Sequence, residues 1–117
     1  MSLAALLNQT ADLQSCDYDS DTSAGIKRKY PPDGGSTVAS GVAVRIEDAS
    51  LREKEAYATQ NIYITHRIIT ESTAIQNGYR WSYGGRYFIV NDIARRRAIG
   101  GMNDFYVAMC EEVAPNG

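Results

Sequence analysis

Alternation between apolar and polar residues, repeated over consecutive short segments, is the feature that most constrains how this chain can fold. Side chains on one face of a strand recur at every second position, so such alternation is typical of strands with one buried face. It occurs at residues 41–49, 61–70, 79–83, 86–93 and 102–113. Eight tyrosines among 117 residues strengthen the preference for strands, because aromatic side chains favour them. The pattern predicts a half-buried antiparallel sheet.

Glycine-containing pairs between these segments mark the turns. Gly84-Gly85 separates two alternating runs by two residues, which is the spacing of a β-hairpin. Asn77-Gly78 is a second turn signal. A chain of 117 residues has the size of one domain. We therefore predict that residues 1–117 form a single all-β domain, a small antiparallel β-barrel, with a helical turn at 3–7 and a weak strand at 9–16.

The segment 17–41 differs from the rest of the chain. It is rich in Asp, Ser, Gly and Pro, a composition that buries little apolar surface. We interpret it as a long polar loop near the N-terminus that extends from the barrel, with a short strand at 26–30. Loops of this length are uncommon in compact domains and are often functional or flexible.

Two groups of charged residues are candidates for an interface. One group lies in the 17–41 loop and the other follows the 86–93 strand. They are Asp17, Asp19, Asp21, Lys27, Arg28, Lys29, Arg95, Arg96 and Arg97. Basic runs of this kind are either solvated surface or contacts for phosphate or an acidic partner. The net charge of −2 argues against a dedicated nucleic-acid binder.

Metal and cofactor sites are not indicated. The alternating aspartates resemble the start of a calcium-binding loop, but the sixth position is not glycine and the twelfth is not glutamate. Cys16 and Cys110 lie far apart without CxxC spacing, and a single histidine cannot join them into a zinc site. We predict no metal, no cofactor and two reduced thiols, as in a cytosolic protein.

The only histidine, His66, lies on a predicted strand where its neighbours Thr65 and Arg67 are expected to face the other way. A catalytic histidine needs a nucleophile or carboxylate placed beside it by the fold. We therefore predict no catalytic residue and no enzyme activity. We expect His66 to be structural or interfacial and Cys110 to be a small core residue.

Four apolar residues on neighbouring predicted strands, Trp81, Ile64, Ile89 and Val107, are expected in the barrel core. The aromatic residues of the same region leave a second interpretation open, an OB-like nucleic-acid-binding module in which bases stack on exposed rings. Such a platform must leave Trp81 or Tyr87 accessible, whereas a barrel core buries them. Exposure of these rings therefore separates the two interpretations.

Several short motifs, in a consistent order between residues 42 and 113, resemble the phage head-tail joining proteins, also called head closure or stopper proteins. The motifs are Val44-Arg45-Ile46-Glu47-Asp48 with Arg52-Glu53, Thr65-His66-Arg67-Ile68, Tyr79-Arg80-Trp81, Gly85-Arg86-Tyr87-Phe88-Ile89-Val90 and Val107-Ala108-Met109-Cys110-Glu111-Glu112. The 17–41 segment matches nothing in that family pattern. The likeness therefore covers the predicted barrel strands and leaves the loop aside.

The resemblance implies a structural subunit that forms a homo-oligomeric ring, with twelvefold symmetry favoured over sixfold. Such a ring closes the filled head and provides the platform for tail attachment. Its partners would be the portal or adaptor protein on the head side, the tail terminator or tail tube on the other side, and packaged DNA. It would be made in the host cytoplasm and lie in the head-tail neck of the virion, with no membrane contact. Another neck or tail ring protein, such as a tail terminator, shares this logic and remains an alternative.

The ring that the resemblance implies leads to a hypothesis about the 17–41 loop. We expect it to be mobile in the free subunit and to order on assembly, where it contacts a ring neighbour or faces the DNA channel. Its acidic and basic halves could pair between adjacent copies. Each exposed ion pair would contribute only about 0.2–1 kcal/mol, so repetition around the ring would matter more than any single contact.

Overall fold

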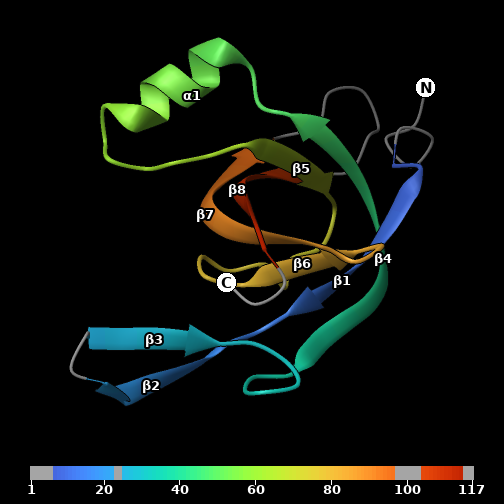
Figure 1. The fold of residues 1–117 in the computed structure, drawn as a ribbon. Helices are drawn as coiled ribbons and strands as arrows, with labels where there is room; N and C mark the ends of the chain where they lie inside the picture. Colours follow the sequence, from blue (N-terminus) through green and yellow to red (C-terminus); the bar gives the residue numbers. More distant parts are fainter. Residues whose placement is uncertain (1–6, 23–24, 97–103, 115–117) are drawn as a thin grey trace.

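Six strands form a closed antiparallel barrel in the computed structural model, which describes residues 7–22, 25–96 and 104–114 (Figure 1). Neighbours around the barrel follow the order β1-β4-β5-β8-β7-β6. The strands are β1 (Gln9–Gln14), β4 (Thr37–Asp48), β5 (His66–Thr70), β6 (Arg80–Tyr83), β7 (Arg86–Arg96) and β8 (Phe105–Val113). The predicted all-β class and the small antiparallel barrel are confirmed. The helical turn predicted at 3–7 falls almost entirely outside the described residues.

Barrel closure depends on β1, which pairs with β4 along one edge and with β6 along the other. The β1–β4 register shifts between Ala11 and Leu13 and again between Leu13 and Gln14. Irregularities of this kind bend a strand and increase its twist, which lets a sheet curl onto itself. The weak strand expected at 9–16 is therefore the element that closes the barrel.

The turn predicted at Gly84-Gly85 joins β6 to β7. Both glycines have positive φ, 54° and 85°, and the flanking residues Tyr83 and Arg86 are paired. Positive φ at both central positions is the geometry of a two-residue hairpin turn, which glycine adopts without a steric penalty. The predicted Asn77-Gly78 turn lies just before β6, with Gly78 at φ 91°.

The 17–41 segment is not one long loop. Its first part forms the strands β2 (Asp17–Thr22) and β3 (Gly25–Lys29), which pair as a separate two-stranded sheet, and its last residues are the start of β4. The polar composition provides no core of its own, but β2 and β3 pair along their facing edges, where each strand satisfies backbone groups of the other. The short strand expected at 26–30 is present one residue earlier, as β3.

The segment 61–70 is extended as predicted only from His66 onward, and the chain before it contains a helix that the alternation did not indicate. This helix, α1 (Leu51–Ala58), begins with a capping box. Ser50 Oγ accepts from the Glu53 amide at 3.1 Å, and the Glu53 carboxylate accepts from the Ser50 amide at 2.9 Å. This sequence signature, serine followed three residues later by glutamate, could have predicted the helix start.

Two apolar clusters share the core. The barrel interior holds Ala11, Leu13, Val44, Ile68, Ile75, Trp81, Phe88, Val90, Ala108 and Cys110. A second cluster lies on the outer face of the barrel, where Ala49, Ile64 and Met109 are buried with Tyr57, Ile62 and Val107 packed against them. Cys110 is fully buried, as predicted.

Only one of the four residues expected in the barrel core lies there. Trp81 is fully buried inside the barrel, whereas Ile64 and Val107 belong to the second cluster and Ile89 is half-buried in neither cluster. The error has a simple cause on β8, which is covered on both faces. Ala108 points into the barrel, and its neighbour Val107 points towards the α1 side.

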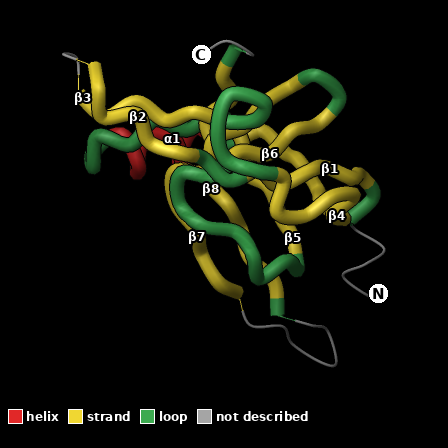
Figure 2. Tube along the Cα trace, turned by 90° about the horizontal axis from the view of Figure 1, so that it is seen from below, coloured by secondary structure: helices red, strands yellow, loops and turns green. Residues whose placement is uncertain are grey.

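Helix α1 and the β2–β3 hairpin project from the same side of the barrel, on the left in both Figure 1 and Figure 2. In the described part of the chain, α1 is the longest helix at eight residues, and no helix there is long and apolar enough to span a membrane. Helix α1 and the β2–β3 hairpin are therefore the described elements that lie outside the six-stranded barrel.

Candidate functional site

The β2–β3 hairpin carries six of the nine predicted interface residues. Its register places Asp17 opposite Lys29, Tyr18 opposite Arg28 and Asp19 opposite Lys27. Acidic and basic residues thus face one another within one hairpin, an arrangement that stabilises cross-strand pairs. The register therefore offers these residues partners of opposite charge within one copy, and their pairing between copies stays a prediction.

Of the hairpin side chains, only those of Asp17, Tyr18, Arg28 and Lys29 are described, and all four are exposed. Tyr18 is 62% exposed, which is unusual for so large a ring. The side chains of Asp19, Asp21 and Lys27 lie outside the described set. The described side chains of the hairpin therefore present a tyrosine and charges of both signs at the surface.

The root of the hairpin is attached to the barrel by a buried tyrosine. Tyr30 is 7% exposed, and its hydroxyl donates to the Gly78 carbonyl. Burial raises the pKa of Tyr30, so this hydroxyl stays protonated and able to donate. The return to β4 passes Gly35, at φ 68°, where a Cβ atom would lie 2.2 Å from the Ser15 carbonyl oxygen. Only glycine fits this close approach.

Arg80 of β6 lies beneath the same root and is 6% exposed. Its guanidinium is 4.7 Å from the Tyr30 ring centre and 4.1 Å from that of Tyr87. Nε donates to Gln14 Oε1 at 2.7 Å, and Nη2 donates to the Pro31 carbonyl at 3.0 Å. Burial lowers the pKa of Arg80, although an arginine remains charged at any ordinary pH. One cation thus joins β1, β6, β7 and the hairpin root.

The second predicted basic group does not form one patch. Arg95 and Arg96 end β7, and Arg97 lies outside the described residues. Arg95 pairs with Asp104 at 2.7 Å, whereas Arg96 lines a cleft under α1. Successive residues of a strand point to opposite faces, so adjacent arginines serve different surfaces.

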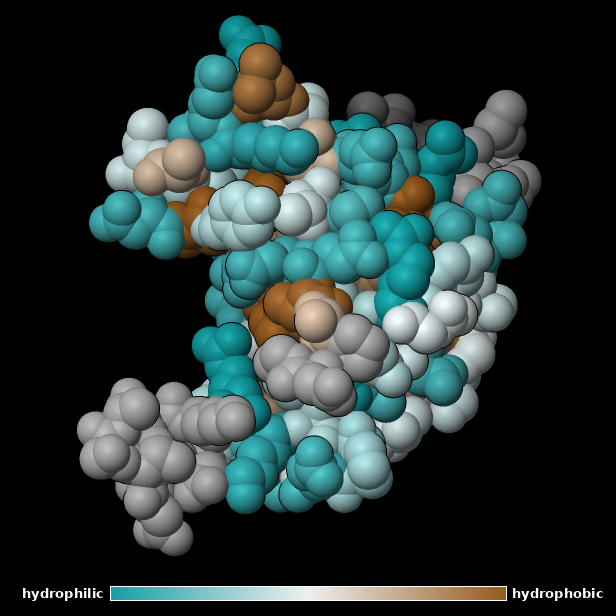
Figure 3. All heavy atoms as spheres, viewed as in Figure 1, coloured by the Kyte–Doolittle hydropathy of each residue, from teal (hydrophilic) through white to brown (hydrophobic). Residues whose placement is uncertain are grey.

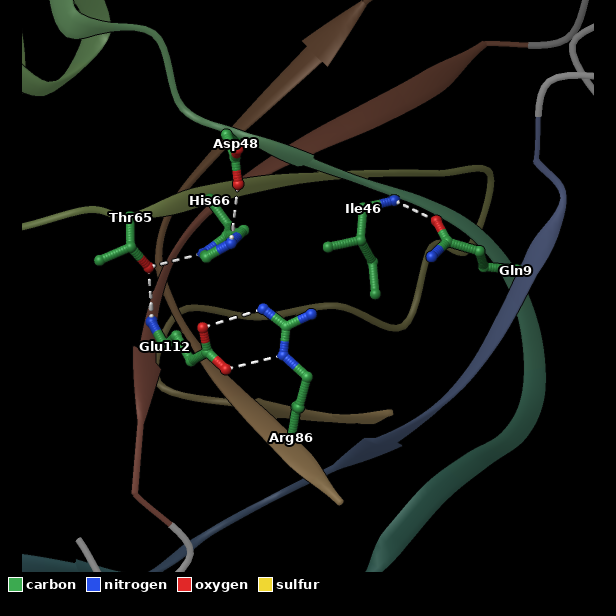
Figure 4. Close-up of polar contacts among 7 residues, drawn as sticks. All are labelled: Gln9, Ile46, Asp48, Thr65, His66, Arg86 and Glu112. Atoms are coloured by element: carbon green, nitrogen blue, oxygen red, sulfur yellow. Dashed lines mark hydrogen bonds and ion pairs between the residues drawn. The ribbon is translucent and has the colours of Figure 1, made fainter. Parts of the chain in front are cut away.

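His66 lies in a hydrogen-bonded chain that the sequence analysis did not expect (Figure 4). Its Nε2 is 3.1 Å from the Asp48 carboxylate, and its Nδ1 is 2.8 Å from the Thr65 hydroxyl. The expectation that Thr65 faces away from His66 is wrong, because β5 begins at His66 and strand alternation does not extend to Thr65. The carboxylate only accepts, so in the neutral ring Nε2 carries the hydrogen and Nδ1 accepts from the hydroxyl.

Threonine, histidine and aspartate, the residue types of this hydrogen-bonded chain, also occur in catalytic chains of a nucleophile, a base and an acid. Here the Thr65 hydroxyl also accepts from the Glu112 amide at 2.8 Å, and Asp48 is 92% exposed at its side chain. The His66 ring packs edge-on against Phe88 at 5.1 Å. The contacts hold the start of β5 against β4, β7 and β8, which agrees with a structural role. The absence of catalytic activity stays a prediction.

The described residues contain no group of three His, Cys, Asp or Glu side chains that could hold a metal ion. Cys16 and Cys110 are both free thiols. Burial raises the pKa of Cys110 well above its usual range, so this thiol is unreactive.

Trp81 and Tyr87, the two rings on which a base-stacking platform would depend, are both covered at least on one side. Trp81 is 0% exposed, and one face of the Tyr87 ring is covered by Arg80. Stacking on nucleic-acid bases needs an open ring face. By the criterion of ring exposure, the OB-like binding module is disfavoured.

A cleft between α1 and the outer face of β5, β7 and β8 is the feature that sequence analysis missed. Its volume is about 450 Å³. The rim is polar and the floor is formed by apolar residues of the strands. The lining residues are Arg52, Glu53, Ala56, Tyr57, Arg67, Ile69, Ala94, Arg96, Phe105, Val107 and Met109. The Ser50 capping box was the available signal for the helix, but no local pattern indicated the cleft beneath it.

Comparison with known proteins identifies no relative: no protein-family description matches the sequence, and no curated protein matches it.

Proposed function

We propose that this chain is a structural subunit of a phage head-to-tail connector ring, which closes the filled head and provides the tail attachment platform. The motif resemblance is the observation that supports this kind of assembly in particular. The feature of the fold that supports it best is the β2–β3 hairpin, a projecting ribbon mounted on a rigid barrel. Exposed strand edges of this kind are ready to pair with another chain.

The attachment of the hairpin is what makes it suitable for assembly. Tyr30 and Arg80 hold its root in a buried position, so the ribbon leaves the barrel in a defined direction. In the described residues β2 and β3 pair only with each other, which leaves the outer edge of each strand without a strand partner. A contact between one edge and a different surface of the next copy, repeated with rotation, generates a closed ring.

The sharpest test shortens the hairpin and keeps its root. Replacing residues 19–27 by Asn-Gly leaves Tyr18 and Arg28 flanking a two-residue turn. We expect the native chain to assemble into particles of twelve or six copies of its 12.9 kDa mass, and the shortened chain to remain a folded monomer. Native mass spectrometry measures both. A native chain that stays monomeric at high concentration, or a shortened chain that assembles normally, would contradict the proposal.

A charge-swapped variant is the matched control. Asp19→Lys with Lys27→Asp exchanges the charges of one opposed pair and preserves their complementarity. If assembly depends on backbone edges, this variant forms rings as the native chain does. Loss of rings in this variant alone would show that side-chain charges between copies are decisive.

Placement in the virion separates a head closure ring from a tail terminator. Electron microscopy of virions with a labelled subunit should show the label at the neck, on the head side of the tail tube. In virions carrying the shortened hairpin, any heads that fill should leak DNA. A label at the tail end of the tube would replace the head closure assignment with the tail terminator alternative.

A further inference from the structure

The cleft under α1 combines an apolar floor with an excess of unpaired positive charge. Three arginines line it, Arg52, Arg67 and Arg96, against a single lining carboxylate, Glu53. Within the described part of the chain, Arg52 and Arg96 have no ion pair. The cleft is therefore locally basic in a chain whose net charge is −2.

Arg67 lies at the centre of this imbalance. Its two terminal nitrogens reach Glu53 and Glu47 only at 3.5 Å, the long limit for a hydrogen bond. Its Nε is buried and has no hydrogen-bond partner in the described residues. A guanidinium has five N–H donors, and leaving buried donors unmatched is costly. The Arg67 side chain is 38% exposed, so its terminal nitrogens can donate to a further carboxylate from outside the chain.

The floor of the cleft explains why a bare anion is not the best occupant. It is made by side chains of β5, β7 and β8, among them Ile69, Val107 and Met109. The space-filling view shows hydrophobic atoms on α1 and beneath it, next to hydrophilic ones (Figure 3). An occupant that matches both the apolar floor and the arginines carries apolar side chains and carboxylates together.

The shape of the site follows from how α1 is held. No residue of the helix is buried, and Tyr57 anchors it through a 2.7 Å hydrogen bond from its hydroxyl to Asp92. Burial and this hydrogen bond raise the pKa of Tyr57 to about 12, so the hydroxyl remains a donor. The cleft lies between this helix and the strands, with Arg52 on α1, Arg67 on β5 and Arg96 on β7. We propose that this cleft binds an extended, acidic and apolar peptide segment of another protein chain.

This inference goes beyond the proposed ring and does not depend on it, because the cleft is formed within one chain. Nucleic acid is the competing occupant, since arginines also bind phosphate. The apolar floor favours the peptide, because a sugar–phosphate backbone has nothing to place against Ile69, Val107 and Met109. The two occupants can be distinguished directly.

Binding can be measured by fluorescence anisotropy with a labelled peptide of about ten residues that mixes Asp and Glu with Leu and Phe. We expect it to bind the native chain more tightly than a peptide in which Ser replaces Leu and Phe, and more tightly than a single-stranded DNA oligonucleotide of similar length. Binding should weaken as salt is raised, because the rim arginines are partly exposed. Equal or tighter binding of DNA, or no peptide binding at about 1 mM, overturns the proposal.

Variants locate the site. Arg52→Gln with Arg96→Gln should weaken peptide binding by about tenfold, the factor expected for two partly exposed ion pairs together. The control is Arg52→Gln with Arg95→Gln, which removes the same net charge but takes its second arginine from the opposite face of β7, where Arg95 pairs with Asp104. The control should weaken peptide binding by about half as much, measured as the change in the logarithm of the dissociation constant. Equal losses in the two double variants would show non-specific attraction.

A spectroscopic readout ties binding to the cleft floor. The chain has three methionines, and Met109, the one that falls within the described residues, lines the cleft. With ¹³C-methyl methionine, the Met109 resonance should shift on addition of the acidic apolar peptide, and in Arg52→Gln/Arg96→Gln the same shift should need a higher peptide concentration. Saturable binding that leaves Met109 unmoved would place the peptide elsewhere and refute the assignment. Unchanged thermal unfolding of each variant shows that the fold is intact.

Discussion

Arg80 carries a charge in an almost fully buried position and has no carboxylate partner among the described residues. Two hydrogen bonds to neutral oxygens and two tyrosine rings compensate for its desolvation. Its position in the motif Tyr79-Arg80-Trp81 therefore has a physical reason, because no other side chain offers a flat cation with divergent donors.

Arg80→Lys should destabilise the fold, because an ammonium group cannot stack between two rings or hold both hydrogen bonds. We expect a loss of about 1–3 kcal/mol in the free energy of unfolding, the range for a hydrogen bond to a charged group and a donor partner left unmatched. Urea unfolding measures it. Arg86→Lys is the control, because Arg86 lies on the β6–β7 hairpin with Arg80 but forms a partly exposed ion pair with Glu112. It should change stability by less than about 1 kcal/mol. Equal losses of stability in the two variants would show that Arg80 does not hold β1, β6, β7 and the hairpin root together.

Glu112 provides a pH-dependent contribution at the residue scale. Arg86 donates to both of its carboxylate oxygens, at 2.8 and 3.0 Å, and this hydrogen bonding lowers the pKa of Glu112 (Figure 4). A carboxyl whose pKa is lower in the folded state stabilises the fold above its unfolded pKa of about 4.3. The contribution is lost as pH falls through the folded pKa.

Comparison with Glu112→Gln isolates this effect. At pH 7 the native chain should be more stable by about 0.2–1 kcal/mol, the range for a pair that is partly exposed to solvent. The difference should stay constant down to about pH 5 and shrink below about pH 4, as Glu112 becomes protonated. Unfolding free energies from pH 7 to 3 provide the readout. A difference that grows on acidification would contradict the assigned pKa direction.

At the scale of elements, α1 is held by contacts at its two ends rather than by a buried face. A helix of eight residues is marginal by itself, and this one contains no buried residue. Its capping box and the Tyr57 anchor are the contacts that keep it over the barrel. The cleft beneath α1 therefore depends on a few polar contacts.

Ser50→Ala should loosen α1 while leaving the barrel folded. Loss of an N-cap costs about 0.5–2 kcal/mol, and here it falls on the helix rather than on the whole fold. Hydrogen exchange should accelerate at the Lys54 amide, which donates to the Ser50 carbonyl, and remain slow in β5 and β8. Thr73→Ala, at an exposed position in the loop after β5, should leave exchange in α1 unchanged. Unaltered exchange at Lys54 in Ser50→Ala would show that the cap is dispensable.

At the scale of the whole molecule, closure of the barrel rests on β1. Gln9 of this strand bonds to both neighbours: its Oε1 accepts from the Ile46 amide at 2.8 Å, and its Nε2 donates to the Tyr83 hydroxyl at 3.2 Å. Leu13, fully buried, adds β1 to the interior cluster. Without β1, the facing edges of β4 and β6 would have no partner.

Removal of residues 1–14 should therefore abolish the folded barrel. Two exposed strand edges and an opened apolar interior favour aggregation. Size-exclusion chromatography should show soluble aggregates or precipitate. The chain with residues 19–27 replaced by Asn-Gly should elute as a folded monomer, because the hairpin lies outside the barrel. A soluble, cooperatively unfolding chain without β1 would show that the barrel does not need closure.

Local patterns determined much of this fold. Alternation and glycine turns report whether successive side chains point to different faces, and this is enough to locate β4 to β8, the Gly84-Gly85 turn and the burial of Trp81 and Cys110. They cannot report what covers each face. Because α1 covers the outside of the barrel, β8 is buried on both sides, and alternation alone places Val107 and Ile64 in the wrong cluster.

Only the tertiary structure decided which charged residues act together. The sequence marks Asp17, Lys29, Arg95 and Arg96 as charged but does not supply their partners. Strand register places Asp17 opposite Lys29, and strand pleating sends Arg95 and Arg96 to opposite faces. Arg52 and Arg67 join Arg96 only because a helix and two strands, distant in sequence, meet across one cleft. Charge is a property of the residue, but a binding surface is a property of the packing that brings residues together.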